Sequence, residues 1–209
     1  GKLICASNDN KVLYDFFRTG TYDRNREFML TSSPSMDILI SSNLERLIYL
    51  STGCDAEANK ALMAELSRKG SYTVTPKMRE AMADFWGNFA SQEENAAEIK
   101  RVFTDMGYLM DTHTGVASAV YQKYVKEMGD KAKTVIASTA SPYKFSHSVM
   151  EAIAGPQEGK EEFALIDEMS AVSRTDVPKA VEEIRTAPIR HNRECDVEGM
   201  KAEVADILG

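Results

Sequence analysis

Three hydroxyl side chains in one short stretch are the residues of this chain best placed to bind a ligand. Ser138, Thr139 and Ser141 follow residues 134–137, an apolar and partly β-branched run that is typical of a strand buried on both faces of a parallel sheet. Pro142 then favours the start of a helix. Because ligands of open α/β sheets bind beyond the carboxyl ends of strands, these hydroxyls are candidates to contact a small molecule. The structural alternative is that Ser141 caps the helix and Thr139 only fills the turn.

Other kinds of site find less support in the residue pattern. The three histidines and three cysteines are scattered and show no metal-ligand spacing, so we predict no metal site. A nucleophile (Thr139 or Ser141), a base (His113 or His147) and an acid (Asp111) could in principle act together. The chain has no G-x-S-x-G elbow to present the nucleophile. The glycines form no phosphate-binding loop.

The elements around these residues alternate between strands and helices. Residues 2–7 read as a buried strand that ends in the polar residues Asn8, Asp9 and Asn10, so a second strand end could face a ligand. We expect a loop over residues 21–30 and then a helix that runs from a Ser33 cap to Leu47, with Asp37 near its positive end. A strand or irregular segment is expected around Trp86.

Capping signals and apolar spacing predict most of the remaining helices. Ser91 and Glu94 form a capping box. Helices are expected over residues 55–69, from 76, 92–106, 112–128, 145–153, 161–169, 178–186 and 196–208. The sequence becomes more charged after residue 155, so we predict two parts, residues 1–155 and a helical extension over residues 156–209.

Composition limits the possible partners. The 209 residues carry a formal net charge of -7, which argues against nonspecific binding to nucleic acid. No apolar run is long enough for a membrane span, and the amino terminus lacks the order of a secretory signal, so we expect no membrane partner and a reducing, cytoplasmic location. Without an initiating methionine, the chain is expected to be part of a longer protein.

Several motifs, taken in order, resemble the C-terminal portion of the threonine synthase family. They are residues 6–10, 19–22, 33–38, 41–46, 107–114 and 138–145. The resemblance implies an α/β fold, the C-terminal part of a fold-type-II (tryptophan-synthase-β-like) enzyme with helices packed on a partial parallel sheet. It also implies pyridoxal 5′-phosphate (PLP) as cofactor and O-phospho-L-homoserine as substrate, which the complete enzyme converts with water to L-threonine and phosphate.

The resemblance assigns one cofactor contact within this chain. Thr139 matches the threonine that meets the pyridine nitrogen of PLP, where a neutral hydroxyl can donate to an unprotonated ring nitrogen. Asp111 and His113 match a segment that approaches the site, although Thr112 stands at a usual proline and Gly115 at a usual alanine. For both residues the alternative is structural: an acid that starts a helix, and a buried, hydrogen-bonded ring.

The Schiff-base lysine and the glycine-rich phosphate loop of the family lie upstream of this chain, in the N-terminal half. No catalytic residue is therefore expected here, Lys144 is not assigned that role, and the chain alone is expected to be inactive. Two other functions stay open at this point. One is a fragment of another PLP lyase of the same fold, such as a dehydratase, and the other is a non-catalytic acidic helical interaction module.

Overall fold

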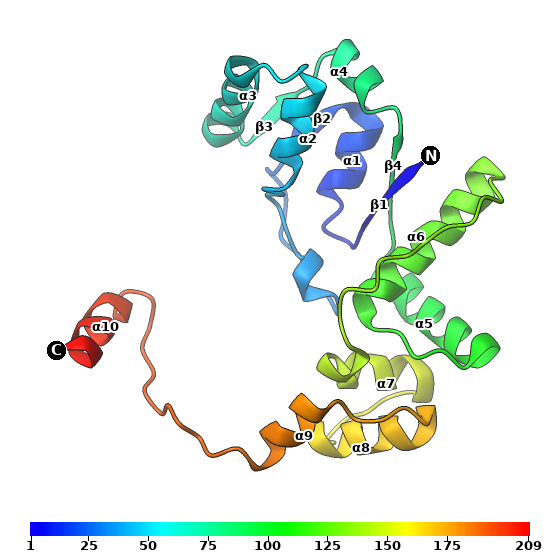
Figure 1. The fold of residues 1–209 in the computed structure, drawn as a ribbon, viewed down its shortest axis with the longest axis vertical. Helices are drawn as coiled ribbons and strands as arrows, with labels where there is room; N and C mark the ends of the chain where they lie inside the picture. The colour runs from blue at the N-terminus through cyan, green and yellow to red at the C-terminus, as the bar shows by residue number, and fades with distance from the viewer. The chain divides into compact units, whose positions relative to one another are not determined.

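A parallel pair of short strands lies beside the first helix of the chain (Figure 1). In the computed structural model, which describes residues 1–209, β1 (Leu3–Ser7) pairs with β4 (Phe85–Phe89) so that Ser7 lies opposite Phe89. The carboxyl ends of both strands therefore lie at the same end of the pair. This confirms the α/β class expected from the sequence, and it confirms a strand around Trp86.

Helices are the main elements of the chain, and both short turns and longer irregular segments join them. The elements are β1, α1 (Val12–Thr19), β2 (Thr21–Asp23), the 3-10 turn η1 (Pro34–Met36), α2 (Leu44–Ser51), α3 (Ala56–Lys69), β3 (Ser71–Thr73), α4 (Pro76–Ala81), β4, α5 (Gln92–Met106), α6 (Thr112–Met128), the 3-10 turn η2 (Pro142–Lys144), α7 (Ser146–Ala154), α8 (Glu162–Ser173), α9 (Lys179–Thr186) and α10 (Met200–Leu208).

Aromatic residues fill the core between α1 and the β2/β3 ribbon. Phe16 of α1 is buried against Tyr22 and Tyr72, whose rings stack 5.4 Å apart. The two tyrosines face each other across the antiparallel pair of β2 and β3. Aromatic cross-strand pairs of this kind stabilise a short ribbon that has few hydrogen bonds of its own.

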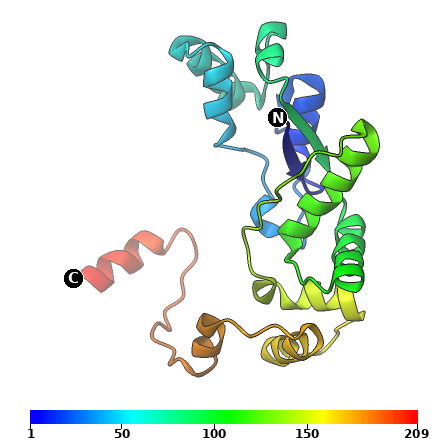
Figure 2. The ribbon, with the colours of Figure 1, turned by 45° about the vertical axis from the view of Figure 1, so that its right-hand side comes forward.

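Four helices then pack one after another in the second half of the first unit. Figures 1 and 2 show α5 against α6, and α7 against both α5 and α8. The capping box of Ser91 and Glu94 starts α5 as predicted, and Asp111 caps α6. α6 also packs against β1.

The prediction of a buried strand at residues 134–137 is wrong. These residues form no ladder, and Val135 is 95% exposed. β1 and β4 pair only with each other, and residues 134–137 exchange no backbone hydrogen bonds with the free edge of either strand. The run instead lines a cavity of about 510 Å³ together with the first residues of β1 and with Tyr121 and Tyr124 of α6.

The long helix predicted from Ser33 to Leu47 is also wrong. Only the single turn η1 forms after Ser33, and the chain becomes helical again at Leu44. Ser33 caps no helix, because its hydroxyl accepts instead from the side chain of Asn8. Asp37 ends η1 rather than favouring a helix start, and β2 lies within the loop predicted over residues 21–30.

The chain divides into two compact units, residues 1–176 and residues 177–209. In the second unit, Arg193 pairs with Glu203 and Asp206 of α10, and α9 carries ion pairs between neighbouring turns. The boundary predicted at residue 155 from composition stays a prediction. No helix in the structure is both long enough and apolar enough to cross a membrane.

Candidate functional site

Asp111 lies directly before α6, and its side chain is fully buried. Its carboxylate accepts from the backbone N–H of His113 at 2.8 Å and of Thr114 at 3.4 Å, and from the hydroxyl of Thr114. An acceptor at this position satisfies backbone donors that no helical carbonyl can reach, and it complements the positive end of the helix. Asp111 is therefore the helix cap that the structural alternative predicted.

The imidazole of His113 is held from both sides. Its Nδ1 lies 3.0 Å from Oδ1 of Asp111, and its Nε2 accepts from the backbone N–H of Ser35 at 3.2 Å. Because Nε2 is an acceptor, the ring proton belongs on Nδ1 and is donated to Asp111. Neither nitrogen is free for a ligand in this arrangement, so the ring is the buried, hydrogen-bonded group that the structural alternative described.

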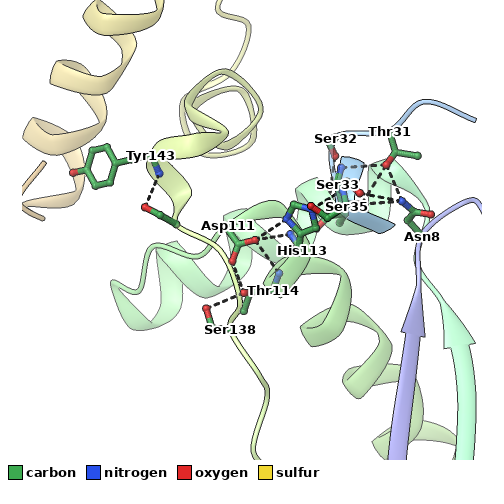
Figure 3. A network of polar contacts seen from close by, with 12 residues as sticks. Asn8, Thr31, Ser32, Ser33, Ser35, Asp111, His113, Thr114, Ser138 and Tyr143 are labelled. Carbon is green, nitrogen blue, oxygen red and sulfur yellow. Dashed lines mark hydrogen bonds and ion pairs between the residues drawn. The ribbon is translucent and has the colours of Figure 1, made fainter. Parts of the chain in front are cut away.

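The stretch with the three hydroxyls is attached to the first turn of α6 by two contacts, of which Figure 3 shows the one between Ser138 and Thr114. Ser138 and Thr114 share a hydrogen bond between hydroxyls 3.0 Å apart. The ring of Phe145 packs on His113 with centroids 4.8 Å apart. The structure thus brings together the two segments that the sequence singled out, residues 111–114 and residues 138–145.

Thr139 lies between these two attachment points and is exposed. Its hydroxyl makes no hydrogen bond within the chain, whereas its neighbour Ser138 is bonded to Thr114. Ser141 caps η2 by accepting from the backbone N–H of Tyr143, as the sequence suggested. The stretch therefore has one hydroxyl that helps to anchor it, one that caps a turn, and one that is available to a ligand.

Thr112 and Gly115 are the two departures from the family pattern, and both fit the local geometry. Thr112 is the first residue of α6, a position that proline also suits, so the helix starts in the same way with either residue. Its hydroxyl is buried and has no partner. At Gly115 a β-carbon would lie 2.2 Å from Oδ1 of Asn95, so α5 approaches α6 too closely for alanine.

A loop over residues 31–37 joins the end of β1 to His113, and sequence reasoning missed it. Nδ2 of Asn8, a side chain that is 2% exposed, lies 2.8 Å from Oγ1 of Thr31, 3.0 Å from Oγ of Ser33 and 2.7 Å from Oδ1 of Asp37, and these acceptors share its two N–H groups. The polar residues at the end of the first strand were the available signal. They hold this loop rather than facing a ligand directly.

The contacts form one path from the end of β1 to Ser138, the neighbour of Thr139. Figure 3 shows it running from Asn8 through the loop to His113, Asp111 and Thr114, and on to Ser138. Apart from the carboxylates of Asp37 and Asp111, every residue of the path is a neutral polar group. The path therefore fixes the side chains within it without adding a positive charge. Such an arrangement can fix a nearby hydroxyl in space, but it offers no nucleophile of its own.

Comparison with protein families matches the second half of the chain. The family described as "Threonine synthase, C-terminal" matches residues 114–189 of this chain. Among relatives, Threonine synthase-like 1 of Homo sapiens is 38% identical over 155 residues, which are 73% of this chain and 20% of that protein. The chain thus spans about a fifth of the length of this relative.

Two solved structures share the fold. The crystal structure of threonine synthase from yeast superposes with a TM-score of 0.79 at 28% identity and covers 99% of this chain and 42% of its own. A PLP-bound threonine synthase from Brucella melitensis has a TM-score of 0.67 at 32% identity and covers 84% of this chain and 36% of its own. In both, the matched part is less than half of the neighbour.

Proposed function

We propose that this chain, which has the sequence and fold of the C-terminal portion of threonine synthases, supplies one wall of a PLP site in a longer protein. The observation that carries the proposal is the exposed Thr139 hydroxyl, free of intrachain bonds, on a stretch that is fastened on both sides to the first turn of α6. A fixed neutral donor is what an unprotonated pyridine nitrogen requires. The solved relative that contains PLP supports the choice of cofactor.

When bound, PLP withdraws electrons from the carbon atoms of an amino-acid substrate. Thr139 would hold the cofactor at its ring nitrogen, and a hydroxyl there leaves the ring less electron-withdrawing than a carboxylate would. Asp111 and His113 would support this contact without touching the cofactor. They shape the first turn of α6, and the His113 ring supports Phe145 at the far end of the stretch.

The whole protein, in this proposal, is a cytoplasmic PLP-dependent lyase that converts O-phospho-L-homoserine and water to L-threonine and phosphate. The chain described here is expected to be inactive alone, because the lysine that binds PLP and the phosphate loop match no segment of it. Titrating the isolated chain with PLP tests this expectation. A saturable adduct that borohydride traps, together with turnover of phosphohomoserine, would contradict it.

The experiment for the assigned contact compares Thr139→Ala with Thr139→Ser in the full-length protein. Alanine removes the donor and serine keeps it, while the exposed position leaves the fold unaffected. In Thr139→Ala we expect the visible spectrum of bound PLP to change and kcat to fall by about 10- to 100-fold, which corresponds to the free energy of one to two hydrogen bonds. In Thr139→Ser we expect both to recover. An unchanged spectrum and turnover in Thr139→Ala would contradict the cofactor contact and leave Thr139 with the purely structural role of filling the turn.

A further inference from the structure

The carboxylate of Asp37 is the common acceptor of the loop that reaches His113. Its Oδ1 accepts from Nδ2 of Asn8 at 2.7 Å, from Nδ2 of Asn10 at 3.0 Å and from Oγ1 of Thr31 at 2.7 Å. Its Oδ2 accepts from the backbone N–H of Thr31 at 2.9 Å. Asp37 forms no ion pair, so these four neutral donors stabilise its charge. A carboxylate with four donors is a strong anchor for the loop around it.

The anchored loop is short and has little freedom. The turn η1 spans only Pro34 to Met36 and lies between Ser33, which Asn8 holds, and Asp37. The backbone N–H of Asp37 also donates to the carbonyl of Pro34 at 3.0 Å, which closes the turn. With both ends fixed to the end of β1, the direction of the Ser35 N–H in the middle of the turn is fixed as well.

That N–H is the group that donates to Nε2 of His113. We propose that Asp37 is a positioning residue for His113, acting through η1: it keeps the Ser35 N–H on Nε2 and so fixes the ring on which Phe145 rests. The inference rests on the proposed function, in which Phe145 and Ser138 hold the stretch that carries Thr139. Asp37 itself touches neither His113 nor Thr139.

Asp37→Asn removes the carboxylate that anchors the loop and changes the shape of the side chain very little. Asparagine can still accept at one oxygen, but its amide group replaces the oxygen that accepts from the Thr31 backbone, so two donors face each other. The loop is then held by fewer bonds, and Ser35 is expected to leave Nε2. Asn10→Ala provides a milder second variant, because it removes one of the four donors and retains the carboxylate.

The experiment uses full-length protein labelled with 15N at histidine, and the His113 signals are assigned by their loss in His113→Asn. In Asp37→Asn we expect the Nε2 signal to move from its wild-type position, with a smaller shift in the same direction in Asn10→Ala. Ser35→Ala is the matched control, because it removes a side chain of the same turn and keeps the backbone donor. Its Nε2 signal is expected to stay in place.

A purely structural role for Asp37 gives a different result. Both variants would then lower the melting temperature while the Nε2 signal of the folded protein stayed at its wild-type position, and this outcome would overturn the inference. The PLP spectrum of the wild-type full-length protein separates this question from the proposed function. If that protein binds no PLP, the proposed function fails, whereas the Nε2 signals still decide whether Asp37 positions His113.

Discussion

The hydroxyls of Thr114 and Ser138 lie 3.0 Å apart and join the first turn of α6 to the stretch that carries Thr139. The Thr114 hydroxyl is also bonded to the buried carboxylate of Asp111. A helix cap and a proposed cofactor contact are therefore linked through a single threonine. This link explains how a stretch without secondary structure of its own can hold a hydroxyl in a fixed place.

Removal of that link should weaken cofactor binding more than folding. In full-length Ser138→Ala, we expect the affinity for PLP to fall by about tenfold, the equivalent of one hydrogen bond, because the stretch loses one of its two attachments. Thr114 keeps its bond to Asp111, so the melting temperature should change little. Fluorescence titration with PLP measures the affinity.

Ser148→Ala is the matched control for this variant. Ser148 lies in α7 and makes no hydrogen bond through its hydroxyl, so its loss should leave PLP affinity as in the wild type. Equal affinities for Ser138→Ala and the wild type would show that the Thr114 link does not support the cofactor contact.

Gly115→Ala should destabilise the protein even though alanine favours helices by about 1 kcal/mol over glycine. The added methyl would lie 2.2 Å from Oδ1 of Asn95 and 2.7 Å from Cγ1 of Ile99, and overpacking of this kind costs about 1 to 3 kcal/mol. Urea denaturation of the wild type and the variant measures the difference. The double variant Asn95→Ala/Gly115→Ala should recover part of the loss, and a Gly115→Ala protein more stable than the wild type would mean that α5 and α6 are less close than described.

Glu98 should make stability depend on acid pH. Burial opposes its ionisation, but hydrogen bonds from Arg101 and Ser118 outweigh burial and hold the pKa of Glu98 below its ordinary value. The ionised form is thus favoured by folding, so its contribution is present above the unfolded pKa, about 4.3, and is lost as the pH falls toward the lowered folded pKa.

Thermal unfolding as a function of pH tests this behaviour. We expect Glu98→Gln to be less stable than the wild type by about 1 to 2 kcal/mol at pH 7, because a partly exposed Arg101 and a buried Ser118 lose a charged partner. The difference should shrink below pH 4. If the stability difference between the wild type and Glu98→Gln stays constant down to pH 2, the lost stability comes from the changed shape of the side chain and not from its charge.

Cys5 should be the least reactive thiol of this chain. Burial raises its pKa to about 11, so it stays protonated at neutral pH, whereas Cys54 and Cys195 are exposed. Relative to a thiol with the ordinary value of 9.0, the thiolate fraction of Cys5 at pH 8 is about a hundredfold smaller. Peptide mapping after brief treatment with iodoacetamide measures the extent of modification at each cysteine, and equal labelling of all three would contradict the raised pKa of the partly buried Cys5.

Local signals were sufficient to predict most helices. The caps at Asp55, Ser91 and Asp111 act on backbone donors two or three residues away, so the sequence contains both partners within one turn. Contacts between distant segments were not predictable in this way. The hydrogen bond between Asn8 and Asp37 joins residues 29 positions apart, and it turned an expected helix start into an anchored loop.

Only some members of the candidate site were predicted, and their arrangement was not. Asp111, His113 and Thr139 were singled out by motif, and the structure brings the segments that carry them together. The buried strand expected before Thr139 is absent, because a strand forms only where its backbone pairs with a neighbour, and the composition of residues 134–137 does not determine that pairing. The role of Thr139 at the cofactor stays a prediction.

The most direct test of that role is the 15N chemical shift of the pyridine nitrogen, measured with ring-labelled PLP bound to the full-length protein. A neutral hydroxyl donor at this nitrogen predicts the shift of an unprotonated, hydrogen-bonded ring nitrogen in the wild type and in Thr139→Ser, and a distinct shift in Thr139→Ala. A shift that is identical in the wild type and in Thr139→Ala would contradict the assignment of Thr139 to the cofactor.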